Sequence, residues 1–140
     1  MSLEDLLIDE LRMRCVEKNL DFEKMRETLK MIGSETVDAF LYGVGMAPDN
    51  PTTLLDLTIA TQAFIFCFEA KVNGERIRSF FRIDDIQTVL VTTLPQKVRL
   101  DVTLKGFGSS FFVNNPSERQ SNVLAFAGHV RNKLHNIALR

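Results

Sequence analysis

The sequence predicts an α+β protein in which a helical N-terminal segment precedes a curved antiparallel meander closed by a C-terminal amphipathic helix. Three observations carry this prediction. Apolar residues recur at helical spacing up to about residue 45. From Leu54 they alternate with polar residues, which is the period of a half-buried strand. After Pro116 the helical spacing returns and continues to the end of the chain.

Size and composition favour one globular domain outside the membrane. The chain has 140 residues, of which 45% are hydrophobic and 25% charged, values that are ordinary for a soluble domain. No apolar run approaches the ~20 residues that cross a bilayer. Cys15 and Cys67 belong to no pair motif, so we expect two reduced thiols in a cytoplasmic protein.

The formal net charge of −1 conceals an asymmetry between the two parts of the chain. Residues 1–50 carry eleven acidic and six basic residues, a net charge of −5, whereas residues 51–140 carry seven and eleven, a net charge of +4. Such a split indicates a basic surface that faces an anionic partner, or two parts that attract each other within one chain or between two copies. Nucleic acid is not expected, because it usually requires a far more basic domain.

Residues 1–45 are predicted to form three short helices. Ser2 and Asp5 have the spacing of a capping box, and Asp21 can cap a second helix that stops at Gly33. Ser34 opens a third helical segment. The apolar stripes of the three are Leu3, Leu7, Leu11 and Cys15; Phe22, Met25, Leu29 and Ile32; and Val37, Phe40, Leu41 and Val44. Helices this short need to pack against a sheet or a second copy.

Residues 46–52, MAPDNPT, are predicted to link the helical segment to the domain at 53–140. Six strands are expected in that domain, joined by short turns. They begin near Leu54, on either side of Asn73-Gly74, and at Ile86, Lys97 and Ser109.

The hairpin around Asn73-Gly74 is the strongest strand signal. The pair predicts a two-residue turn with positive φ at both positions. In the preceding strand Phe64, Phe66, Phe68 and Val72 alternate on one face, and in the following strand Ile77, Phe81 and Ile83 alternate likewise. We therefore expect both sets on the same, core-facing side of the hairpin.

The closing helix is predicted to start at Pro116 and Ser117, with Gln120 completing a capping box. We expect it to cover the Phe-rich side of the meander. Its core-facing stripe is Val123, Phe126, Ala127, Val130, Leu134 and Ile137.

Residues 53–139 resemble bacterial members of the pleckstrin-homology-like (PH-like) superfold. The resemblance rests on FIFCFEAKVNGERIRSFFRIDDIQTVLV, residues 64–91, which is similar to the family's aliphatic strand, basic hairpin and Asp-Ile-x-x-Val entry into the next strand. It implies a half-open barrel closed by the last helix. The chain departs from the family in showing six predicted strands instead of seven, and in lacking a Trp on the closing helix, where Phe126 would take its place.

Lys71, Arg76 and Arg78 are the candidate ligand-binding residues. Phosphoinositide-binding members of the superfold place a Lys before the first hairpin and Arg-x-Arg after it, and these three residues have that arrangement. Arg76 and Arg78 share a face opposite Ile77, and Lys71 is expected to join them across the turn. Three cations at the mouth of a sheet can bind a phosphate group. The alternative is a solvated outer face that keeps the hairpin soluble.

Motifs for catalysis, metals and cofactors are missing from the sequence. His129 and His135 lie six residues apart on one predicted helix and so point to different sides, unlike zinc ligands. We therefore expect no enzyme, no cofactor and no metal. The favoured function is a non-catalytic protein-interaction or self-assembly module whose partner is a protein or a second copy, with Phe107 and the first helix as contact points. The alternative is binding to an anionic membrane surface, peripherally, through the 71–78 hairpin, and an enzyme of unknown type comes third.

Overall fold

The computed structural model describes residues 2–45, 51–106 and 110–139. Within these ranges it contains three α-helices, three short 3₁₀ helices and seven strands. The helices are α1 (Leu3–Glu17), α2 (Phe22–Thr28), η1 (Leu29–Ile32), η2 (Ile83–Asp85), η3 (Ser117–Arg119) and α3 (Gln120–Ala138). The strands are β1 (Ala39–Tyr42), β2 (Thr53–Ala60), β3 (Phe64–Lys71), β4 (Arg76–Arg82), β5 (Ile86–Thr93), β6 (Lys97–Leu104) and β7 (Ser110–Pro116).

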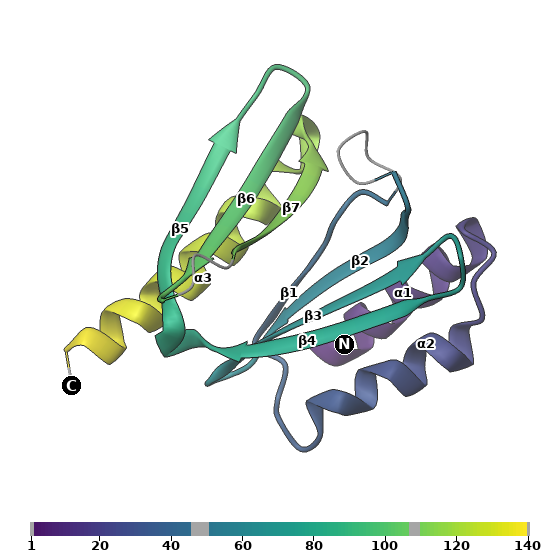
Figure 1. Ribbon diagram of the computed structural model, residues 1–140, viewed down its shortest axis with the longest axis horizontal. Coiled ribbons are helices and arrows are strands. Elements are labelled where there is room, and N and C mark those ends of the chain that lie inside the picture. Colours follow the sequence, from purple (N-terminus) through teal and green to yellow (C-terminus); the bar gives the residue numbers. More distant parts are fainter. Residues whose placement is uncertain (1, 46–50, 107–109, 140) are drawn as a thin grey trace.

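The strands form two antiparallel sheets. The first has the order β1-β2-β3-β4 and the second the order β5-β6-β7. The segment after β1 connects them, because the Gly43 N–H donates to the Asp56 carbonyl of β2 and the Val44 N–H donates to the Asn114 carbonyl of β7, both at 2.8 Å. Figure 1 shows the strands of the two sheets spreading apart from the connection between β4 and β5. The predicted α+β class and antiparallel pairing are confirmed.

The first sheet is covered on both faces. One face packs against α1 and α2, and its core contains Leu57, Ile59, Phe66 and Phe68 together with Leu11 of α1. The other face packs against the second sheet and α3 in a separate core. Figure 1 shows the two layers on opposite sides of the first sheet. The acidic N-terminal segment is therefore a structural layer of the sheet.

The predicted third helix is wrong, because its residues form β1. Phe40 and Tyr42 face α1 and α2, whereas Leu41 lies in the core shared with α3. The spacing of Phe40, Leu41 and Val44 fits a helix, but pairing of this segment with β2 and burial on both of its sides favour the strand. The described residues thus hold seven strands, one more than predicted.

The predicted two-residue turn is also wrong. Three residues, Val72 to Gly74, join β3 to β4, since the Lys71 N–H donates to the Glu75 carbonyl at 2.8 Å. Gly74 has φ +88°, whereas Asn73 keeps a negative φ and accepts from the Glu75 N–H through its side chain. Glycine at the last position is usual for three-residue hairpin loops.

This extra residue shifts the register and moves side chains to the opposite face. Phe66 lies opposite Phe80 rather than Phe81. Because side chains alternate along a strand, a shift of one residue places Ile77 and Phe81 on the side away from Phe66. The prediction that both apolar sets share one core-facing side is therefore incorrect.

Helix α3 packs on the sheets, as predicted, but it covers a different surface. Val123, Phe126, Ala127 and Val130 are buried, and Leu134 and Ile137 pack against the same core. That core includes the inner face of the second sheet and Leu41 of β1. The Phe-rich face of β3 is covered by α1 and α2 instead. The expectation that the last helix closes this face is wrong, because the N-terminal segment occupies it.

Helix starts match the sequence in two of three cases. The Ser2–Asp5 capping box and the Asp21 cap are both formed. At the last helix the predicted box of Ser117 and Gln120 is wrong, since η3 intervenes and α3 has no side-chain cap. Of the predicted linker, residues 46–50 lie outside the described part of the chain, and so does Phe107.

Candidate functional site

The candidate cations Lys71, Arg76 and Arg78 are not on one face. Arg76 and Arg78 lie opposite Ala70 and Phe68 and so share the side that faces α2. Alternation along β3 places Lys71 on the other side with Glu69. The Lys71 Nζ lies 3.1 Å from the Glu69 carboxylate and 3.1 Å from Thr53 Oγ1. Its charge is therefore already paired within the sheet.

Arg76 connects the hairpin to α2. Its Nη1 donates to the Lys24 carbonyl at 3.0 Å and lies 3.5 Å from Thr28 Oγ1. A hollow of about 210 Å³ opens beside this contact. It is lined by Leu20, Asp21, Lys24, Met25, Ala70, Lys71, Gly74, Glu75 and Arg76. Lys24 adds a cation that sequence reasoning missed, and Asp21 and Glu75 offset two of the three positive charges of the lining residues.

Strand β4 is the outer strand of the first sheet, and its exposed length is the second candidate surface. We call it the β4 edge, residues Arg76–Arg82. Every residue of the β4 edge is exposed except the half-buried Phe81. The exposed fraction is 56% for Phe80 and 37% for Ile77. Large apolar side chains thus meet solvent along an open strand.

The hydrogen bonds at both ends of the hairpin show which backbone groups of β4 are unpaired. Glu75 accepts from Lys71, and Ile83 donates to Ala63. In an antiparallel ladder the bonded positions alternate, so the odd-numbered residues of β4 bond to β3. The N–H and C=O groups of the even-numbered residues point away from the sheet. These residues are Arg76, Arg78, Phe80 and Arg82.

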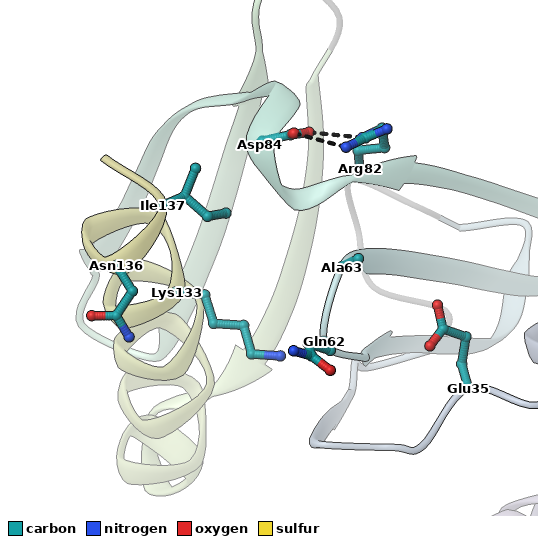
Figure 2. Close-up of a pocket in the computed structure, with 8 residues that line it drawn as sticks. All are labelled: Glu35, Gln62, Ala63, Arg82, Asp84, Lys133, Asn136 and Ile137. Atoms are coloured by element: carbon teal, nitrogen blue, oxygen red, sulfur yellow. Dashed lines mark hydrogen bonds and ion pairs between the residues drawn. The ribbon is translucent and has the colours of Figure 1, made fainter. Parts of the chain in front are cut away.

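Figure 2 shows a larger pocket, of about 370 Å³, between α3 and the β2–β3 turn. It is lined by Glu35, Gln62, Ala63, Arg82, Asp84, Lys133, Asn136 and Ile137. Arg82 makes two hydrogen bonds to Asp84, at 3.0 and 3.1 Å. Lys133 pairs with Asp38 and donates to the Thr61 carbonyl. Both cations of the pocket are thus bound to their own chain, which leaves neither free for an anionic ligand.

Two partly buried carboxylates lie opposite each other on β2 and β3, and no sequence motif indicates them. Asp56 on β2 lies directly opposite Glu69 on β3. Burial, followed by the nearby Glu69 charge, raises the pKa of Asp56 to about 7, although Lys71 acts in the opposite direction. Asp56 alternates with Leu55 and Leu57, a pattern that by itself indicates a position on the polar side of a strand. Because both faces of the first sheet are covered, the alternation does not lead to solvent here.

The remaining titratable groups are dispersed. Burial raises the pKa of the Cys67 thiol to about 12, and Cys15 is buried separately. Burial and the charge of Lys133 lower the pKa of His129. Across residues 2–45, 51–106 and 110–139, no three His, Cys, Asp or Glu side chains gather to hold a metal ion. In the same ranges no helix has the length and apolar character needed to span a membrane.

The β4 edge is therefore the candidate surface with both apolar exposure and unpaired backbone groups, and the hollow beside Arg76 is the candidate with clustered cations. Comparison of the chain with protein-family models, with curated proteins and with solved structures finds no match.

Proposed function

We propose that this chain is a non-catalytic protein-interaction module built on a PH-like domain. Seven strands followed by one closing helix support this architecture, since the superfold has seven. Residues 53–139, which carry the resemblance, contribute six of the strands, and β1 from the N-terminal segment supplies the seventh. Phe126 of α3 is buried in the core, as expected of a residue that takes the place of the family's Trp. The module is cytoplasmic, a compartment in which unpaired thiols such as Cys15 and Cys67 persist.

The observation that carries the proposal is the unpaired β4 edge. An extended segment of a partner can add to such a strand through main-chain hydrogen bonds. Four residues of β4 present their backbone groups outward. The layer of α1 and α2 leaves most of β4 uncovered, because Arg78 and Phe80 are exposed on the side that the helices cover elsewhere. Helix α2 reaches β4 at Arg76, which binds the Lys24 carbonyl, so an incoming strand has to pair beyond that contact.

Proline substitution tests this mode of binding. Arg78→Pro removes an N–H that points away from the sheet and leaves the bonds to β3 intact. Arg78→Ala is the matched control, because it removes the side chain and keeps the N–H. Proteins captured from the cell extract by the wild-type chain should be retained by Arg78→Ala and lost with Arg78→Pro. Capture that is unchanged by Arg78→Pro would contradict strand addition at β4.

A second candidate function, binding to an anionic membrane surface, is favoured by the position of Lys24. Lys24 and Arg76 both line the hollow beside α2, whereas the ammonium group of Lys71 pairs with Glu69 on the other side of the hairpin. Co-sedimentation with vesicles that contain anionic lipid tests this, with the double variant Arg76→Ala and Arg78→Ala as the loss-of-charge form. Salt-sensitive binding that the double variant abolishes would support the candidate. No sedimentation at low salt would exclude it.

A further inference from the structure

We infer that a second copy of this chain pairs with the β4 edge, so that two β4 strands run antiparallel about a twofold axis beside Ser79. The inference rests on the proposed function, because it names the partner of the same edge. It follows from which side chains of β4 are free, from the register that these side chains favour, and from the space around the strand.

Charged side chains usually protect an edge strand from pairing, but two of the three arginines on β4 are turned toward their own chain. Arg76 is bound to the Lys24 carbonyl of α2. Arg82 is paired with Asp84 through two hydrogen bonds. Among the described residues Arg78 alone of the three has no such partner, and it lies next to the exposed ring of Phe80. Asp84 therefore balances the charge of Arg82, whereas Arg76 is held by a neutral carbonyl and keeps its charge, so Arg76 and Arg78 are the unbalanced guanidiniums of each copy.

Backbone geometry restricts the register. A ladder between two β4 edges forms only when even-numbered residues lie opposite even-numbered residues, since these carry the unpaired groups. Ser79 is the middle residue of the seven in β4. Centring the twofold axis on Ser79 places Arg78 opposite Phe80 of the second copy. In this register all seven residues of β4 lie opposite a residue of the second copy. Centring it on Arg78 would instead place the two free guanidiniums directly opposite each other, which is unfavourable.

In this register Arg76 would lie opposite Arg82 of the second copy, whose charge Asp84 balances. The central side chains are complementary on both faces. The ring of Phe80 packs on one side against Phe64 and Phe66, with centroid distances of 6.0 and 5.9 Å, and leaves its other side open. Arg78 of the second copy would lie over that open side as a cation–π contact. On the opposite face Ile77 would meet Phe81 of the second copy. Because each contact occurs twice, the interface closes on itself as a dimer.

Helix α2 contacts the β4 edge at Arg76, which binds the Lys24 carbonyl, and the rest of the strand, from Ile77 onward, follows this contact. In Figure 1 β4 forms the margin of the first sheet, and no further strand lies beside it. The two four-stranded sheets would form one continuous eight-stranded sheet. The α1–α2 layers of both copies would lie on one face of this sheet, and the second sheets of both copies would lie on the other. The strand that the isolated chain leaves open would then be covered.

A single cysteine tests the register. Ser79 lies opposite itself in a non-hydrogen-bonded pair, where the Cα atoms are about 4.5 Å apart, within the range of about 4.4–6.8 Å that a disulfide spans. Ser79→Cys is made together with Cys67→Ala, because Cys67 is the neighbour of Ser79 within the same chain. Ile77→Cys in the same background is the control, since Ile77 lies opposite Phe81 and not opposite itself. Mild oxidation should convert most of the Ser79→Cys chain to a covalent dimer and leave the Ile77→Cys chain without a cross-link.

Light scattering separates the failure of this inference from the failure of the proposed function. The wild-type chain should be dimeric, and Arg78→Pro should shift it to monomer while its circular dichroism is unchanged. A strict monomer at high concentration, or a dimer without the Ser79→Cys cross-link, would overturn the self-pairing. If such a monomer still captures a foreign protein in a manner that Arg78→Pro abolishes, the proposed function stands without the inference.

Discussion

The two edges of the first sheet, β1 and β4, differ in how the rest of the chain treats them. The short edge strand β1 is enclosed: Val44, just after it, bonds to β7, Asp38, just before it, pairs with Lys133 of α3, and Tyr42 bonds to α1. The longer strand β4 is exposed along almost its whole length. One edge thus joins three other elements of the fold, whereas the other is available to a partner. The stability of the chain should depend on the first and its association on the second.

The largest expected difference between the edges is in core packing. Leu41→Ala on β1 removes a side chain that is 4% exposed and should lower the free energy of unfolding by about 2–5 kcal/mol. Ile77→Ala on β4 should cost about 1 kcal/mol or less, because Ile77 already faces solvent. Urea unfolding of both variants at low protein concentration checks this, with the exposed Leu90→Ala on β5 as a second surface control. Equal losses for Leu41→Ala and Ile77→Ala would remove the contrast between the two edges.

How much the sequence could predict also differs between the edges. The strong alternation of β3 and β4 makes the hairpin recognisable from the sequence. The register of the two strands, however, depends on one additional loop residue, and the register determines on which face of the hairpin Phe81 lies. The enclosed strand β1 was read as a helix because residues buried on both sides lose the alternation that marks a strand. The helix caps at Ser2 and Asp21 were predictable because capping is local.

The candidate site shows the same limit. Alternation correctly placed Arg76 and Arg78 together, since the spacing of two residues within one strand does not depend on register. The position of Lys71 did depend on the loop, and its pairing with Glu69 was not predictable from the sequence. Lys24 and Asp56 were missed for a further reason. Lys24 lies near Arg76, and Asp56 lies opposite Glu69, only in the folded chain. A local sequence pattern does not indicate contacts between residues so far apart in the sequence.

The next largest effect concerns pH at the corner where β1, β2 and β7 meet. Gly43 leaves no room there, because a Cβ would lie 2.9 Å from both the Asp56 carboxylate and Val113. The folded state raises the pKa of Asp56 from its ordinary value of 3.8 to about 7, so the folded state holds a proton that the unfolded chain releases. The contribution of Asp56 is therefore most favourable below pH 3.8 and is lost as the pH rises through about 7.

Asp56→Asn should remove this dependence. At pH 8 the variant should be more stable than the wild-type chain by an amount on the order of 1–4 kcal/mol, and below pH 4 the difference should vanish. Urea unfolding at several pH values measures it. Asp101→Asn, on the partly exposed face of β6 and paired with Arg99, is the control and should not reproduce the gain. An Asp56→Asn chain that is less stable at pH 8 would show that the carboxylate is favourably bound when charged.

The smallest effect tests how α1 holds the enclosed edge. The Tyr42 hydroxyl donates to the Leu7 carbonyl of α1 at 2.9 Å in a buried position, and burial, together with the charge of Glu10, raises the pKa of Tyr42 well above its usual value. Tyr42→Phe should lower the free energy of unfolding by about 1 kcal/mol, the value of one neutral hydrogen bond. Because Tyr42 is the only tyrosine of the chain, tyrosinate absorbance reports on it alone. The folded chain should show no ionisation near pH 10, and the signal should rise only together with loss of helical circular dichroism. Ionisation near pH 10 in a chain that keeps its helices would mean that β1 is not closed by α1, and the contrast with β4 would then be weaker than the fold implies.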